Sequence, residues 1–477
     1  MKKPNVLFIL TDDQRFDTIH ALGNPHIHTP NLDTLANDGS AFYRHFCTTP
    51  ICTPARAEIL TGCNTFTNKV PWFGMPINPE LTLMPKAFRD AGYHTMHCGK
   101  WHNDGHPRDK GYDAVHCAFG TKDNLNDYQE HAHYMRFKEP YGEVEDHGDA
   151  LFADAALYAI DHAPSDMPWF CYLAFHGPHD PHVSPEPFAS MYNAADMPLY
   201  PNHMPEHPFD NGDMVIRDEL IENWPREQDA MRRYRARYYG MISHIDHQIG
   251  RVLGLLKARG ELENTIIMFT GDQGVANGSH GLLGKENMYD HSIASPFVIR
   301  GPGIPVGGRF TAMSHHVDIL PTLCDLAEIS RPSSASDGFS LVPVLRGEKE
   351  RVRDAILCEF YSPEEPGEPM RNTQRCVRTE RWKLAWYPLI GRYQLFDLAN
   401  DQYELCDLLT GWRKRRREFV VSGKAGWRKD AWAAYDPRPR YTQTEIERTA
   451  NELHARMCSL MKEQGDPLAT TVPPIPG

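Results

Sequence analysis

Short runs of apolar residues recur along the first three quarters of the chain, and most are followed at once by polar or glycine residues. Runs of four to eight apolar residues are typical of strands that are buried on both faces of a parallel sheet. Five such strands are predicted, at Val6–Leu10, Thr95–Cys98, Trp169–Phe175, Ile266–Thr270 and Pro296–Arg300.

Helical periodicity lies between these strands. Its clearest example is one apolar stripe that Gly260 ends, formed by Ile242, Ile245, Ile249, Val252, Leu253 and Leu256. Strands that alternate with helices predict an α/β fold, a large and mostly parallel sheet flanked by helices. The stretch 177–230 is rich in Pro, His and Asn and predicts a long loop over the functional site.

The pattern changes after about residue 370. Three short strands joined by turns are predicted at Cys376–Arg378, Trp382–Trp386 and Tyr393–Phe396, followed by a helix over about 445–463. We therefore expect an α/β catalytic domain at 1–370 and a smaller C-terminal subdomain at 371–477, an antiparallel sheet plus a helix.

Composition narrows the class of protein. The 477 residues carry a formal net charge of −13, which argues against a nucleic-acid partner because phosphate binding needs a basic face. The basic run at 413–417 is more typical of a solvated face than of an anion site. No run is long enough to span a membrane, and no signal peptide precedes Asp12, so we expect a cytoplasmic protein, or a periplasmic or secreted one if a leader has been removed.

Polar side chains follow two of the predicted strands. Asp12 and Asp13 come after the first, and Asp272 and Gln273 follow another. An Asp-Asp pair alone is usually a solvated turn, but the carboxyl ends of parallel strands meet at one edge of a sheet, where α/β proteins place their sites. Carboxylates gathered there suit a hard divalent cation, Ca²⁺ or Mg²⁺ rather than Zn²⁺.

The most informative segment is Cys-Thr-Pro-Ala-Arg at 52–56, followed by Leu-Thr-Gly at 60–62. Alone, Cys52 would be a buried thiol, but the spacing Cys-x-Pro-x-Arg with its trailing Leu-Thr-Gly resembles the signature of the formylglycine-dependent sulfatases, type I members of the alkaline phosphatase-like superfamily. Five segments between residues 11 and 303 follow the order of that family, and the resemblance extends over about residues 4–410.

The resemblance implies a modified nucleophile and a metal site. Cys52 would be oxidised to formylglycine by a maturation enzyme, and Arg56 would hold its hydrated form. The implied cation is Ca²⁺, with Mg²⁺ as an alternative, and the implied ligands are Asp12, Asp13, the modified Cys52, Asp272 and Gln273. The family commonly has Asn or His where Gln273 stands, and Gln offers an amide oxygen on a longer arm.

Three further segments of the family carry charged or titratable residues. Gly-Lys-Trp-His at 99–102 implies that Lys100 neutralises a sulfate oxygen and that His102 accepts a proton. His179, in a Pro-His-x-Pro segment, would assist the leaving group, and Lys285 would bridge the sulfate and the leaving oxygen. Alone, each would be a structural histidine or a surface lysine. His176 and His182 have no such mapping.

The sequence therefore predicts a sulfatase that acts on a sulfate ester, most readily that of a sulfated mono- or oligosaccharide. One alternative is a phosphonate monoester or phosphodiester hydrolase on the same fold, because tetrahedral oxyanions of phosphorus and sulfur fit similar sites. A second alternative is an inactive relative that binds sulfated glycans without cleaving them.

Overall fold

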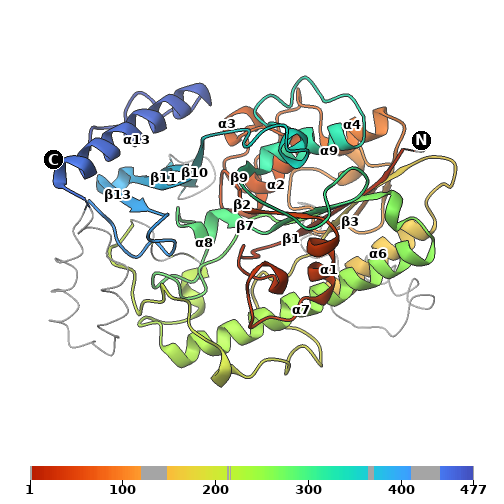
Figure 1. The fold of residues 1–477 in the computed structure, drawn as a ribbon, viewed down its shortest axis with the longest axis horizontal. Helices are drawn as coiled ribbons and strands as arrows, with labels where there is room; N and C mark the ends of the chain where they lie inside the picture. The colour runs from red at the N-terminus through yellow and green to blue at the C-terminus, as the bar shows by residue number, and fades with distance from the viewer. Residues whose placement is uncertain are drawn as a thin grey trace.

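The computed structural model describes residues 3–119, 148–363, 370–409 and 441–475, apart from residues 212, 213, 215 and 217. Within these residues the main sheet has nine strands (Figure 1). Its order is β4 (Ala114–Val115), β3 (His94–Gly99), β5 (Trp169–Ala174), β1 (Asn5–Thr11), β6 (Thr265–Gly271), β8 (Phe297–Arg300), β2 (Ser40–Phe46) and β7 (Ala294–Ser295), with β9 (Gly308–His315) also paired to β2. The strands from β4 to β6 run parallel, whereas β8 is antiparallel to both of its neighbours.

Both faces of this sheet are covered, which explains why β1 is apolar at consecutive positions. Val6, Phe8 and Leu10 point into one core, and Leu7 and Ile9 into the other. Each fully buried side chain of this kind contributes about 1.5–3 kcal/mol to stability. Figure 1 shows α6 and α7 along one face of the sheet and α2, α4 and α9 along the other.

The described helices are short, except for three of them. Their bounds are α1 (Pro30–Asp38), α2 (Cys52–Thr61), α3 (Thr65–Asn68), α4 (Met84–Asp90), α6 (Gly148–Asp161), α7 (Gln228–Ala258), α8 (Asp290–Ile293), α9 (Ile319–Leu326), α10 (Val342–Leu345) and α13 (Gln443–Glu463). The predicted stripe from Ile242 to Leu256 lies largely on the buried side of α7. The helix begins before the stripe, at Gln228. None of these helices is long and apolar enough to cross a membrane.

A second sheet is antiparallel and has four strands among the described residues. They are β10 (Ala355–Pro363), β11 (Met370–Thr379), β12 (Trp382–Tyr387) and β13 (Arg392–Asp397). One face packs on α13 through residues such as Leu384 and Met457. The other face packs on the chain around the start of α2, where Cys376 and Phe360 share a core with Ile51 and Ala55. The small sheet therefore forms part of the wall behind Cys52.

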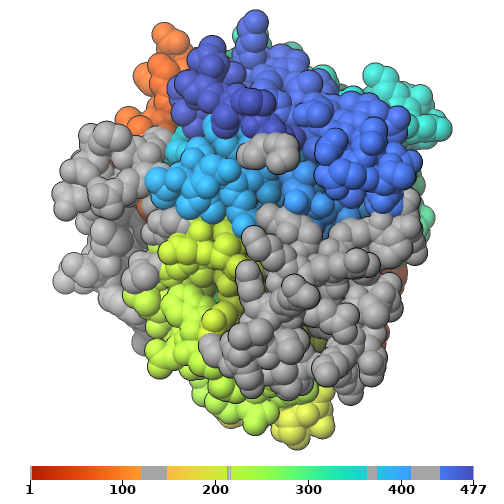
Figure 2. Space-filling view, turned by 90° about the vertical axis from the view of Figure 1, so that its left-hand side faces the viewer, coloured from red at the N-terminus to blue at the C-terminus, as the bar shows by residue number. Residues whose placement is uncertain are grey.

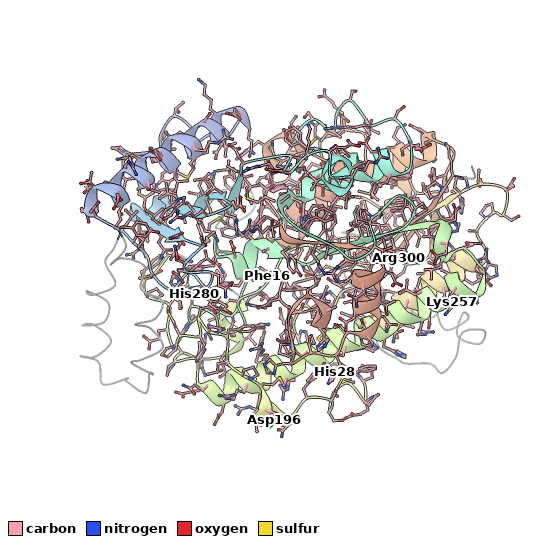
Figure 3. The ribbon with its side chains drawn as sticks, in the orientation of Figure 1. Phe16, His28, Asp196, Lys257, His280 and Arg300 are labelled. Atoms are coloured by element: carbon pink, nitrogen blue, oxygen red, sulfur yellow. The ribbon has the colours of Figure 1, made fainter. Side chains whose placement is uncertain are left out.

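A buried ion network joins the two sheets. Lys383 of β12 pairs with Asp290 at the start of α8 and with Glu404, and it donates to the carbonyl oxygen of Met288 at 3.0 Å. Glu404 also accepts a hydrogen bond from the backbone N–H of Asp290 at 2.7 Å. His280, which Figure 3 labels beside this junction, places its Nε2 3.0 Å from the carbonyl oxygen of Glu404. These contacts fix the segment that follows Lys285.

The predicted fold class is confirmed, including the five strands, the smaller antiparallel sheet and its final helix. Strands β2, β4, β7, β9 and β10 were not predicted. Because β10 starts at Ala355, the small sheet begins before the boundary expected at 370/371, and that division into domains stays a prediction. The basic run at 413–417 lies outside the described residues.

The predicted excursion at 177–230 contains only two short 3₁₀ helices among its described residues, Ala194–Asp196 and Asp218–Ile221, before α7 begins at Gln228. Figure 2 shows this yellow-green segment meeting the blue C-terminal region on the surface of the molecule. Asn202 contributes to that contact, because its Nδ2 donates to the carbonyl oxygen of Tyr403 at 3.2 Å.

Replacing Lys383 with Met is expected to lower the free energy of unfolding by about 3–5 kcal/mol, because the buried carboxylates of Asp290 and Glu404 lose their shared cation. Denaturant unfolding followed by circular dichroism measures this loss. The exposed Lys462 on α13 provides the control, since Lys462→Met should change stability little. Equal stability of the two variants would contradict the role assigned to the network.

Candidate active site

Strand pairing brings three carboxylates together at one edge of the main sheet. Thr11 of β1 lies opposite Gly271 of the parallel strand β6, so the residues that follow each strand emerge side by side. Oxygens of Asp12, Asp13 and Asp272 lie within 4.8 Å of one another, and all three residues are buried. The Asp13 backbone N–H donates to Oδ1 of Asp272 at 3.1 Å, which ties the two strand ends together.

Helix α2 aims the Cys-x-Pro-x-Arg motif at these carboxylates. Cys52 is its first residue, and the Cys52 thiol donates to Oδ1 of Asp12 at 3.2 Å. Arg56 lies one helical turn later on the same face. Its guanidinium donates to Asp272 Oδ2 at 3.0 Å through Nε and to Asp12 Oδ2 at 2.8 Å through a terminal nitrogen. The planar guanidinium thus holds carboxylates from both strands in one geometry.

Two buried lysines complete the positive side of the site. Lys100 follows β3 directly and forms an ion pair with Asp12. The Lys285 ammonium lies 2.6 Å from Asp13 Oδ2, 3.2 Å from His179 Nε2 and 3.3 Å from Asp218 Oδ2. Burial alone would lower the pKa of Lys285, but the neighbouring acids, Asp13 foremost and then Asp218 and Asp12, together outweigh it, so the pKa is raised well above its ordinary value and the side chain stays charged.

The two predicted site histidines, His102 and His179, lie beside these lysines. His102 has a left-handed backbone, with φ of 56°, and its carbonyl oxygen accepts a hydrogen bond from Thr53 Oγ1 at 2.8 Å. Its Nδ1 is buried without a hydrogen-bond partner. Burial lowers the pKa of His102, and the charge of Lys100 lowers it further. Burial and the charge of Lys285 do the same for His179, so both imidazoles are neutral near pH 7.

The three carboxylates differ in their protonation. Burial raises the pKa of Asp12, but Lys100 and Arg56 outweigh it and hold that pKa well below its ordinary value. Burial raises the pKa of Asp13 to about 7 against the attraction of Lys285. Burial, together with the neighbouring charge of Asp12, raises the pKa of Asp272 to about 8. Burial, reinforced by repulsion among the acids, therefore leaves Asp272 mostly protonated and Asp13 about half protonated near neutral pH.

Gln273 completes a donor set that fits a hard cation. Its Nε2 donates to Asp13 Oδ1 at 2.6 Å and to Cys52 Sγ at 3.2 Å, while its Oε1 is buried without a hydrogen-bond partner. Turning the amide plane over would present that oxygen to the carboxylates instead. Three carboxylates and one amide oxygen are ligands that Ca²⁺ and Mg²⁺ accept, and a divalent charge would relieve the repulsion among the acids.

The structure brings all ten predicted site residues into one cluster. They are Asp12, Asp13, Cys52, Arg56, Lys100, His102, His179, Asp272, Gln273 and Lys285. Sequence reasoning missed Asp218, which lies in the loop 177–230 where no motif marks it. His176 and His182, which have no counterpart in the family pattern, differ in their contacts. His176 stacks on His179 with ring centres 5.1 Å apart, whereas His182 packs against Tyr234 at 4.4 Å.

Comparison with protein families adds an independent finding. The family model described as Sulfatase matches residues 4–329, which is more than half of the chain and includes all ten residues of the cluster. A second model, described as N-sulphoglucosamine sulphohydrolase, C-terminal, matches residues 278–416 and thus most of the small sheet.

Individual relatives span most of the chain. An arylsulfatase from Clostridium perfringens is 29% identical over 87% of this chain and 92% of its own length. An N-acetylglucosamine-6-O-sulfatase from Bacteroides thetaiotaomicron is 27% identical over 88% of this chain and 85% of its own. The crystal structure of a phosphonate monoester hydrolase of Agrobacterium radiobacter superposes with a TM-score of 0.72 at 27% identity, over 88% of this chain and 94% of the other.

The protonation of the acids predicts a pH-dependent response to divalent cations. Because the pKa values of Asp13 and Asp272 are raised from 3.8 to about 7 and about 8, folding binds protons, and the cation-free protein should lose stability as pH rises from about 4 to about 8. A cation binds the ionised acids. The increase in melting temperature on adding CaCl₂ should therefore be larger at pH 9 than at pH 5.

Thermal unfolding at the two pH values, with and without the cation, measures this difference. Replacing Asp272 with Asn should reduce the increment at pH 9. Replacing Glu350, which is exposed and far from the cluster in the sequence, with Gln provides the control. A cation response that is equal at pH 5 and pH 9 would rule out the protonation assigned to these two acids.

Proposed function

Because this chain belongs to the sulfatase family, we propose that it hydrolyses the sulfate ester of a sulfated carbohydrate, with Cys52 converted to formylglycine and with Ca²⁺ as its cofactor. The observation that carries this proposal is the position of Cys52. It is the first residue of α2, and its sulfur contacts Asp12 and Gln273 at the centre of the buried cluster. A nucleophile at this atom would meet the sulfur of an ester held by the two lysines.

An unmodified Cys52 is poorly suited to attack. Burial raises the pKa of its thiol well above the ordinary value, and the negative charge of Asp12 raises it further. The thiol, rather than the reactive thiolate, is therefore present near neutral pH. When formylglycine replaces it, the hydrated aldehyde supplies one hydroxyl that attacks sulfur and a second whose collapse expels sulfate, so no water has to attack the sulfated intermediate.

The side chains around Cys52 supply fixed charge and proton transfer. Lys100 and Lys285 are charged and buried, and they would bind sulfate oxygens at a point where little water screens them. His102 is neutral, and its free Nδ1 would accept a proton from the nucleophile. His179 Nε2, 3.2 Å from the Lys285 ammonium, would face the oxygen of the leaving alcohol. Asp12, Asp13, Asp272 and Gln273 would hold the cation.

A carbohydrate ester is favoured by the relatives. The Bacteroides thetaiotaomicron protein is an N-acetylglucosamine-6-O-sulfatase by name, and its similarity spans both the main sheet and the small sheet. A maturation enzyme that generates formylglycine is the partner this proposal requires.

Hydrolysis of a phosphonate monoester or phosphodiester is the second candidate. It is supported by the 27% identity to the Agrobacterium radiobacter hydrolase over 88% of this chain. A tetrahedral phosphorus oxyanion would meet the same lysines and cation. Comparing kcat/KM for an aryl sulfate and for an aryl phosphonate separates the two candidates.

Mass spectrometry of the peptide that contains Cys52 tests the modification. Protein produced together with a formylglycine-generating enzyme should carry a side-chain aldehyde, or its hydrate, in place of the CH₂SH group. An unmodified thiol under those conditions would favour the remaining candidate, a protein that binds sulfated glycans without cleaving them.

Replacing Cys52 with Ala should lower kcat/KM for any cleaved sulfate ester by on the order of 10³ or more, because the covalent nucleophile is lost. Calcium binding measured by calorimetry should be retained, since the four side-chain oxygen ligands remain. Cys63→Ala, which removes a buried thiol just beyond α2, is the matched control and should leave turnover unchanged. Substantial turnover by a folded Cys52→Ala protein would overturn the assignment of the nucleophile.

A further inference from the structure

Two exposed aromatic rings border the active site. Phe73 and Phe119 retain 36% and 41% of their accessible surface, although most phenylalanines of the described chain are buried. Besides its exposed part, each ring packs against a histidine at the site. An aromatic ring that is exposed beside a polar site offers an apolar face to a bound ligand.

Phe73 lies against the proposed proton acceptor. Its ring centre is 5.4 Å from that of His102, with an angle of 34° between the planes. Behind it, Trp72 packs edge-on against Phe73 at 5.1 Å and against Phe360 of the small sheet at 5.9 Å. The exposed ring is therefore supported by a partly buried tryptophan and by β10, which restricts its movement.

Phe119 pairs through its backbone with the end of β3. Its backbone N–H donates to the carbonyl oxygen of Gly99 at 3.0 Å, and its carbonyl oxygen accepts from Trp101 at 2.8 Å, so it is aligned with Lys100. Its ring meets His176 edge-on at 5.1 Å. His176 in turn stacks on His179, so this ring is one imidazole away from the residue assigned to the leaving group.

These contacts place the backbone of Phe119 at one end of the segment 100–102 and the ring of Phe73 at the other. Phe119 is bridged to Lys100, and Phe73 contacts His102. Phe73 touches His102, and Phe119 reaches His179 through His176, so the alcohol of an ester bound between these histidines would lie within reach of the rings. The flat, uncharged faces of Phe73 and Phe119 suit another ring, either aromatic or the C–H face of a pyranose, better than an acyclic chain that must be ordered on binding.

We propose that Phe73 and Phe119 form an aromatic clamp that makes the enzyme selective for sulfate esters of cyclic alcohols. This inference rests on the proposed sulfatase activity and assigns its substrate preference to two residues. The clamp contacts the alcohol and leaves the sulfate to the lysines and the cation, so its removal should alter selectivity between alcohols and leave the chemistry at sulfur in place.

Cyclohexyl sulfate and 2-hexyl sulfate form a matched pair of probes, because both are secondary esters with six carbons and one negative charge. The wild-type enzyme carrying formylglycine should show a higher kcat/KM for the cyclic ester. Phe73→Ala and Phe119→Ala should each reduce that preference by about 10-fold, the effect expected when an apolar ring contact is lost. Met75→Ala, at a residue on the same loop as Phe73 with 38% exposure and no aromatic ring, should preserve it.

Replacement by Leu separates ring stacking from simple burial. Phe73→Leu and Phe119→Leu keep apolar volume but lack a ring, so they should still lose the preference for the cyclic ester. A Leu variant that keeps the wild-type preference would overturn the clamp. An equal loss of kcat/KM on both esters, or an unchanged ratio, would also overturn it. Choline sulfate cleaved in preference to the cyclic ester would show that the rings bind a cation instead. If the mature wild-type enzyme cleaves no sulfate ester, the proposed function itself fails, and this result is distinct from the others.

Discussion

The site depends on keeping three carboxylates buried at one sheet edge. Asp12, Asp13 and Asp272 lie at the ends of adjacent parallel strands, and their mutual repulsion would be prohibitive without compensation. Arg56, Lys100 and Lys285 supply positive charges, each from a different segment of the chain, and protons held by Asp272 and in part by Asp13 lower the negative charge further. The helix that carries Cys52, the end of β3 and the segment before α8 are therefore drawn to the same point by charge balance.

The small sheet extends this constraint into the C-terminal part of the chain. Its inner face packs against the residues that lead into α2, and Lys383 holds the segment that follows Lys285. Two of the charged groups that balance the acids are thus supported from behind by residues that lie far away in the sequence. The active site is consequently a property of both sheets together, although all ten of its predicted residues belong to the first 285.

Complete burial on both faces made several strands of the main sheet predictable, although β10, which is buried on both faces as well, was not predicted. Strands β1, β5 and β6 are uninterrupted apolar runs for that reason. Strand β9 was missed because its first half is partly exposed, and β2 because Tyr43 and Arg44 interrupt its apolar pattern. The site residues could be predicted from the sequence because motifs mark them at strand ends. Asp218, Phe73 and Phe119 were not, since they lie in loops whose path is decided by tertiary contacts.

Gln273 affects the charge balance of the buried acid cluster. A carboxamide has a donor end and an acceptor end, and here the donor end faces Asp13 and Cys52. The donor end offsets part of the negative charge of Asp13, while the acceptor end is buried without a partner. A carboxylate at this position would have no donor to offer. Gln273 thus adds a neutral hydrogen-bond donor to the cluster without adding to its negative charge.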